Sequence, residues 1–151
     1  MSIEKRLDTK LAAQGAEFLV LGHILLEDIE CYKAYTNYPD YDLLATSPAG
    51  LKNARIQVKS RWATNRAGHF PIDSLDCDFV VHVAFNRGIR KQKRVLDDTK
   101  SPIEYYVFPI ELIRKALLPS NKINIRNIFE HEKYKDRWDL IKEFLFKGEE
   151  K

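Results

Sequence analysis

Residues 41–60, YDLLATSPAGLKNARIQVKS, contain the pattern that decides the fold. The stretch begins with a short apolar run in which Asp42 is embedded, and the Ser-Pro-Ala-Gly sequence that follows is typical of a turn. Residues 54–59 then alternate between polar and apolar side chains, which puts the polar ones on one face of an extended strand. Those polar residues are Arg55, Gln57 and Lys59. The stretch therefore predicts a β-hairpin from Tyr41 to Lys59, with Asp42 on the first arm beside Gln57 on the second.

Hydrophobic patterns on both sides of this hairpin predict an α/β domain. Apolar residues at steps of three and four predict a helix at 7–26, and a nearly continuous apolar run predicts a strand at 77–85 that is buried on both faces. We expect the buried stripe of that helix to be Leu11, Ala12, Gly15, Phe18, Leu19, Gly22, Leu25 and Leu26. The other expected elements are strands at 29–35 and 105–108, helices at 110–118 and 134–146, a candidate strand at 121–128, and loops at 60–74 and 86–102. This order predicts helices layered on a mixed sheet.

The composition predicts a soluble, cytoplasmic protein of one domain, residues 1–151. The hydrophobic fraction is 44% and the charged fraction is 31%, which are values of an ordinary globular chain. The longest apolar stretch, residues 18–21, is far too short to span a membrane, and the charged N-terminus does not resemble a signal peptide. We therefore expect Cys31 and Cys77 to be reduced, buried thiols. The net charge of +3 is compatible with a polyanionic partner but does not require one.

The hairpin brings together the residue types that phosphodiester hydrolysis needs. A carboxylate such as Asp42 can hold a hard divalent cation, for which Mg²⁺ takes few protein ligands and keeps several waters. The cation polarises the phosphate and lowers the pKa of the attacking water. A lysine beside it, here Lys59, stabilises the charge that grows on the phosphoryl oxygens. The alternative is that Gln57 and Lys59 form a solvated strand face, with Asp42 paired to Lys59.

Asp42 followed by Gln57-Val58-Lys59 resembles the signature of the PD-(D/E)XK nuclease superfamily, in the variant with Gln in the third position. Tyr41-Asp42-Leu43-Leu44 and residues 55–60 are similar to a branch that includes homing-endonuclease-like and restriction-like proteins. Gly15-Ala16-Glu17 resembles the helical glutamate of many members, and residues 76–80 and 105–110 are also similar to that branch. The resemblance spans roughly residues 11–118. It implies a restriction-endonuclease-like three-layer α/β fold, in which helices flank a central mixed β-sheet.

The resemblance also implies a DNA endonuclease that depends on Mg²⁺ or Mn²⁺. Carried over by position, Asp42 is the principal metal ligand, Gln57 is a neutral ligand, and the Val58 carbonyl completes that side. Lys59 orients or activates the water, and Glu17 reaches the metal directly or through a water. Asp40 follows Pro39 and is the literal "PD" of the motif, but we favour Asp42 because a metal ligand has to be anchored on the sheet.

Several cations and aromatic residues are candidates for contact with DNA. The candidate phosphate contacts are Arg61, Arg66, Arg87, Arg90, Lys91, Lys93 and Arg94. Trp62 is either a base-stacking residue or a cover of the core, and His69 is either an extra general base or an ordinary loop residue. The aromatic residues of the last predicted helix are expected to pack into the core. A homodimer is expected because two strands of a duplex need two sites.

Two other classes of protein remain open. The first is a protein that kept the nuclease fold and binds nucleic acid without cleaving it, which the neutral Gln57 favours. The second is an interaction protein without a nucleic-acid partner, since a fold does not by itself determine a function.

Overall fold

The computed structural model of the chain describes residues 9–34, 40–64, 69–88, 90–92, 95–96 and 100–147. Five strands form the central sheet in the order β1-β2-β3-β5-β8. They are β1 (Glu30–Lys33), β2 (Leu43–Thr46), β3 (Asn53–Arg61), β5 (Phe79–Ala84) and β8 (Glu104–Pro109). β3 and β5 run parallel and the other neighbouring pairs are antiparallel, so the sheet is mixed, as the sequence predicts.

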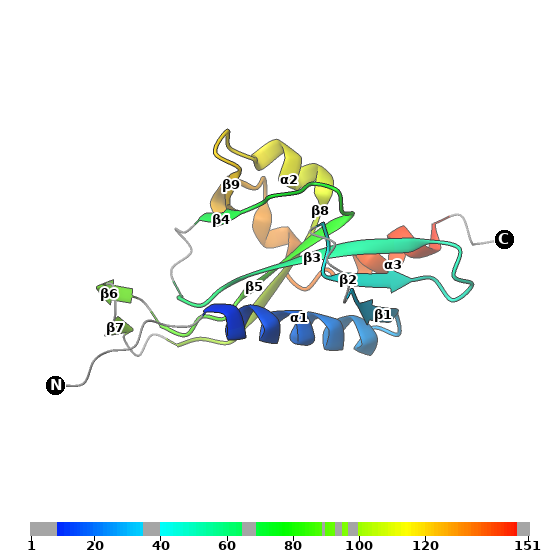
Figure 1. Cartoon of the computed structure of the whole chain (residues 1–151), viewed down its shortest axis with the longest axis horizontal. Helices are drawn as coiled ribbons and strands as arrows, with labels where there is room; N and C mark the ends of the chain where they lie inside the picture. Colours follow the sequence, from blue (N-terminus) through cyan, green and yellow to red (C-terminus); the bar gives the residue numbers. More distant parts are fainter. Residues whose placement is uncertain are drawn as a thin grey trace.

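Helices cover both faces of this sheet (Figure 1). On one face, α1 (Thr9–Leu26) and α3 (Asp139–Phe146) share a core cluster with the strands, which includes Val20, Ile56 and Ile141. On the other face, α2 (Ile110–Ala116) belongs to a second cluster, which includes Val80 and Phe108. The predicted three layers of an α/β domain are confirmed.

The smaller elements lie around this framework. β4 (His69–Pro71) pairs with β9 (Lys122–Asn124) beside α2. β6 (Arg90–Gln92) pairs with β7 (Val95–Leu96) at the left of Figure 1, the side toward which the N-terminal end of α1 points. Two short 3-10 helices, η1 (Ile125–Asn127) and η2 (His131–Tyr134), precede α3. Every helix in the described residues is too short or too polar to cross a bilayer.

The predicted hairpin is present as β2 and β3, but β2 begins only at Leu43, so Asp42 lies just before the first arm and is not paired with Gln57 in the ladder as predicted. Leu43 pairs with Ile56 and Thr46 pairs with Asn53, and the turn between them contains Gly50 at a φ of 67°, a conformation that glycine adopts without strain. β3 continues to Arg61, because its second half pairs with β5 after β2 has ended.

The stripe predicted to be the buried face of α1 is wrong. Leu11, Phe18 and Leu26 are 69%, 56% and 84% exposed, whereas the buried residues are Ala16, Val20 and Ile24. α1 carries apolar residues around most of its circumference, so the three- and four-residue spacing fits two different stripes. Two of the buried residues, Ala16 and Val20, are smaller than leucine and phenylalanine and allow the helix backbone to lie close to the sheet there.

Other elements differ from prediction at their bounds or in type. The expected loop at 60–74 contains the end of β3 and all of β4, and the expected loop at 86–102 contains β6 and β7. The last helix begins at Asp139 instead of 134, while the candidate strand at 121–128 is β9 followed by η1. The buried Cys31 and Cys77 are free and belong to the clusters on opposite faces of the sheet. Burial raises the pKa of each thiol to about 12.

Candidate active site

Asp42 lies directly before the first residue of β2, which is Leu43 opposite Ile56 of β3. From Gln57 onward β3 has no β2 partner, which leaves an opening at this edge of β3. The Asp42 backbone N–H donates to the Ile56 carbonyl at 2.9 Å, and the Asp42 carboxylate accepts the Val58 N–H at 2.8 Å through Oδ2. A side chain thus takes the hydrogen bond that a longer β2 would have supplied. Because the N–H and C=O of one strand residue point to the same side, the Val58 carbonyl also faces this opening.

Glu17 of α1 reaches the same opening. Burial, and next the nearby charge and side chain of Asp42, raise the pKa of Glu17. The opposing influence is Lys33 of β1, whose Nζ lies 3.5 Å from Glu17 Oε2. These side chains are mostly shielded, with 21% of the Glu17 side chain and 13% of the Lys33 side chain exposed. Two neighbouring carboxylates with little access to solvent repel each other when both are charged, and a bound cation would offset that repulsion.

Gln57 and Lys59 flank Val58 on the other face of β3. Their ladder partners in β5 are Val80 and His82, which lie on the α2 side of the sheet. Gln57 is only 4% exposed, and its Oε1 has no hydrogen-bond partner. Lys59 is partly exposed and forms no ion pair with Asp42 or Glu17 in the described part of the chain. The pairing of Asp42 with Lys59 that a solvated hairpin face would have shown is therefore not observed.

The donor types around the opening fit a hard divalent cation. Among the described residues there is no group of three His, Cys, Asp or Glu side chains that could hold a metal. The set here is instead two carboxylates (Glu17 and Asp42), with the Val58 carbonyl facing the same gap, while the buried amide oxygen of Gln57 lies next to it along the chain on the other face of β3. An unpartnered buried acceptor is costly, which an oxygen-seeking ion such as Mg²⁺ would relieve.

His82 is a buried histidine beside the Lys59 position. It is 4% exposed, packs 5.1 Å from the Phe70 ring, and leaves Nδ1 without a partner. Burial and then the positive charge of Arg61 lower the pKa of His82 to about 4. His82 is therefore neutral at physiological pH and adds no charge to this side of β3.

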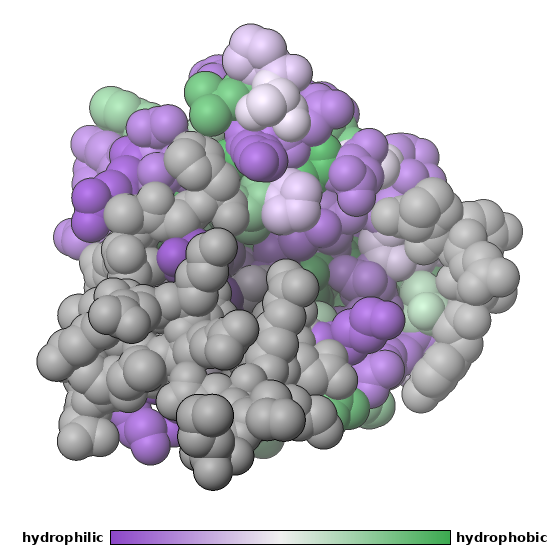
Figure 2. Space-filling view, turned by 60° about the vertical axis from the view of Figure 1, so that its left-hand side comes forward, coloured by the Kyte–Doolittle hydropathy of each residue, from purple (hydrophilic) through white to green (hydrophobic). Residues whose placement is uncertain are grey.

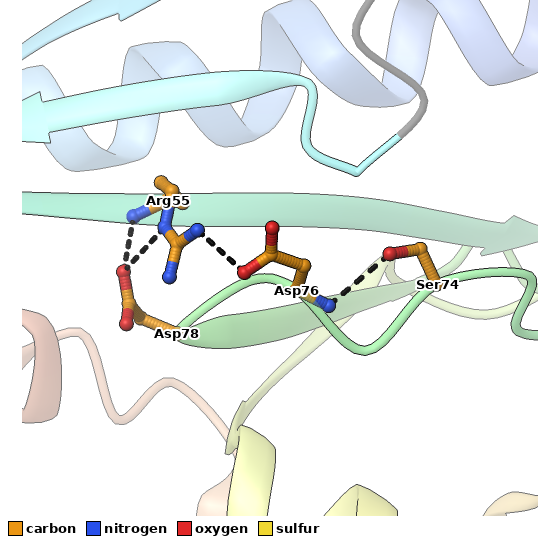
Figure 3. A network of polar contacts seen from close by, with 4 residues as sticks. All are labelled: Arg55, Ser74, Asp76 and Asp78. Carbon is orange, nitrogen blue, oxygen red and sulfur yellow. Dashed lines mark hydrogen bonds and ion pairs between the residues drawn. The ribbon is translucent and has the colours of Figure 1, made fainter.

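A polar network holds the start of β3 against β5 (Figure 3). The Arg55 backbone N–H and Nε both donate to Asp78 Oδ2, at 2.8 and 3.4 Å, and Nη1 donates to Asp76 Oδ1 at 2.7 Å. In return the Asp78 N–H donates to the Arg55 carbonyl at 2.8 Å. The Asp76 N–H donates to Ser74 Oγ at 3.1 Å. These bonds secure the parallel register two residues before Gln57.

The residues predicted to contact DNA are only partly described. Arg61 is half-buried near His82, and Arg87 is exposed. The backbones of Arg90 and Lys91 lie in β6, while their side chains, and all of Arg66, Lys93 and Arg94, lie outside the described residues. In the view of Figure 2, the described surface is mostly hydrophilic, with hydrophobic residues scattered over it.

Trp62 and the aromatic residues near the C-terminus pack on the protein. Trp62 lies against the first core cluster, with its ring centroid 5.7 Å from that of Phe85. Trp138 is buried, and Phe144 and Phe146 are partly buried against the same cluster. The packing of the Trp62 ring favours its role as a cover of the core. The side chain of His69 lies outside the described residues.

Sequence reasoning missed Lys33 and His82. Lys33 comes from the edge strand β1, outside the motif, and its approach to Glu17 depends on how α1 lies on the sheet. His82 lies in a nearly continuous apolar run, where a histidine is the one residue that can titrate. That lone polar residue in a strand buried on both faces is the signal that could have identified it.

Comparisons with known proteins support the fold. No family model matches the sequence, and no curated protein matches it. Among solved structures, the chain is similar to a bacterial homing endonuclease, I-Ssp6803I, with 20% sequence identity and a TM-score of 0.59. The similarity covers 90% of this chain and 93% of that protein. The chain therefore has a nuclease-like α/β fold, with a mixed five-stranded sheet between helices.

Proposed function

We propose that the chain is a metal-dependent endonuclease that hydrolyses DNA, with a centre of the PD-(D/E)XK type in its Gln-x-Lys variant. The observation that carries the proposal is the meeting of the Glu17 and Asp42 carboxylates at the strand opening beside Val58. The fold shared with a homing endonuclease supports the reaction class.

Each residue has a distinct part in this proposal. Glu17, Asp42 and the Val58 carbonyl would hold Mg²⁺ or Mn²⁺ at the open edge of β3, and Gln57 would reach the ion from the other face of the strand. The metal supplies a polarised phosphate and a more acidic water when bound. Asp42 is held in place by the Val58 N–H, so its orientation does not depend on the metal. Lys59 would place its ammonium group against the phosphate, since it forms no ion pair with either carboxylate within the described residues.

Cleavage of supercoiled plasmid DNA in Mg²⁺ or Mn²⁺ tests the proposal. We expect Asp42→Asn and Lys59→Met each to lower the rate by roughly 10²–10³-fold, the range for loss of one charge-stabilising group. Matched controls are Asp73→Asn and Lys115→Met, because both residues are exposed and distant in sequence from the motif. Unchanged cleavage in the Asp42 and Lys59 variants would remove the mechanism.

The same preparation distinguishes the alternative function. Salt-dependent DNA binding by the wild type without cleavage in either metal would contradict the endonuclease proposal and identify a binding protein. Gln57→Glu then becomes informative, because it restores the acidic residue of the commoner motif and adds the missing negative charge.

A further inference from the structure

The outward face of α1 is apolar and exposed. Leu11, Phe18 and Leu25 recur every seven residues along it and are 69%, 56% and 50% exposed. Leu19 and Leu26 lie on the same side and are 38% and 84% exposed. We call these five residues the α1 stripe. The opposite side of the helix already packs on the sheet through Ala16, Val20 and Ile24, so the stripe is not part of the core of this chain.

The α1 stripe contains no charge, which restricts what can cover it. Lys10 and Glu17 are the only Lys, Arg, Asp or Glu residues in the helix, and both lie about a quarter turn from Phe18 by helical geometry, on the flank opposite Leu19 and Leu26. A polyanion such as DNA is bound through cations, so it does not match this surface. An apolar protein surface does.

We infer that the α1 stripe is the interface between two copies of this chain, packed through antiparallel α1 helices. The stripe is nearly symmetric about Phe18, with Leu11 seven residues before it and Leu25 seven residues after it. A twofold axis at Phe18 places Leu11 of one copy against Leu25 of the other. An interface between identical copies requires such a self-complementary surface.

Two further features fit this arrangement. Gly15 and Gly22 lie between the larger residues of the stripe, and nothing lies within 4 Å of a Cβ built at either position, so a second helix can approach there. The exposed fractions of the five residues correspond to roughly 500 Å² of apolar surface. A standard interface buries about 800 Å² per partner, of which about 60% is apolar, so the stripe supplies the required apolar area.

The interface would border the candidate active site. Lys33, which pairs with Glu17, also places its Nζ 4.3 Å from the Phe18 ring centroid. One face of Phe18 thus belongs to the site and the rest of its exposed surface belongs to the stripe. The inference does not depend on the proposed function, because it follows from the exposure and symmetry of the helix alone.

Sedimentation of the purified full chain between about 1 and 100 µM tests the inference. We expect a dimer for the wild type and at least a hundredfold weaker association for Phe18→Asp, since a charge would be buried on the twofold axis. The control Phe129→Asp replaces a phenylalanine that is 75% exposed elsewhere on the surface, and it should leave the dimer intact. A monomeric wild type at 100 µM, or equal effects of the two substitutions, would overturn the inference.

A second experiment keeps the test decisive if Phe18→Asp does not fold. Under mild oxidation, Phe18→Cys should cross-link into a disulfide-bonded dimer, because the two copies of this residue face each other at the axis. Phe129→Cys should not cross-link at the same concentration, and the native Cys31 and Cys77 are buried. Failure of Phe18→Cys to cross-link faster than Phe129→Cys would contradict the antiparallel arrangement.

Discussion

Replacement of Gln57 by methionine should stabilise the metal-free protein. Gln57 is 4% exposed and its Oε1 lacks a partner, so folding removes that oxygen from water without compensation. An unsatisfied buried polar group costs about 1–3 kcal/mol, and methionine is apolar and of similar size. We therefore expect Gln57→Met to raise the free energy of unfolding by about 1–2 kcal/mol. For a chain of this length the midpoint of thermal unfolding should rise by roughly 2–8 °C.

Urea and thermal unfolding with EDTA, and again with Mg²⁺ or Mn²⁺, measure both sides of this prediction. A metal at 100 times its dissociation constant stabilises the protein that binds it by about 2.7 kcal/mol. Added metal should raise the free energy of unfolding of the wild type more than that of Gln57→Met. The difference in stability between the two proteins should therefore become smaller or change sign. The matched variant Gln57→Glu should be less stable than the wild type in EDTA, because it buries a charge. A Gln57→Met protein that is less stable than the wild type in EDTA would refute the reasoning.

Three other substitutions test separate parts of the site. Lys33→Met removes the cation that pairs with Glu17 and should tighten Mn²⁺ binding by roughly three- to tenfold in a calorimetric titration, whereas weaker binding would show that Lys33 supports the metal site. The folded-state pKa of His82 lies below its ordinary value, so the unfolded chain binds the proton more tightly, and stability should fall by about 3 kcal/mol as pH drops from about 6.5 to about 4. Urea unfolding at several pH values should show this loss in the wild type and not in a His82→Leu variant. Asp78→Ala should cost about 1–2 kcal/mol in the same assay because Asp78 binds the start of β3, whereas Asp76→Ala, whose carboxylate is 67% exposed, should cost less than about 1 kcal/mol; equal losses would contradict this assignment.

The hairpin could be predicted from sequence because its information is local. Alternation from Arg55 to Lys59 and a turn sequence before it determine the strand pair without reference to the rest of the chain. The orientation of α1 could not be predicted in the same way. Both sides of that helix are apolar, and the preference for Ala16 and Val20 against the sheet depends on the close approach of the helix, which periodicity does not encode.

The candidate site could likewise be predicted only in part. The spacing of Asp42, Gln57 and Lys59 predicts that they lie on neighbouring strands, and the helical position of Glu17 predicts its approach from outside the hairpin. The structure brings Glu17 directly to Asp42 but puts Gln57 and Lys59 on the other face of β3. Gln57 and Lys59 face away from Ile56 and Val58 because side chains alternate along β3. Asp42 lies at the gap because β2 begins only at Leu43, and such an end point is set by tertiary packing.

The order of the elements along the chain has a consequence for synthesis. Glu17, Lys33, Asp42 and the Gln57-Val58-Lys59 segment all precede Arg61, so the ribosome has made every residue of the candidate site before β5 begins at Phe79. A nascent chain that ends at Arg61 carries the whole set but lacks the strand that covers the inner edge of β3. The residues of the candidate site are therefore synthesised before the strand that completes the sheet beside β3.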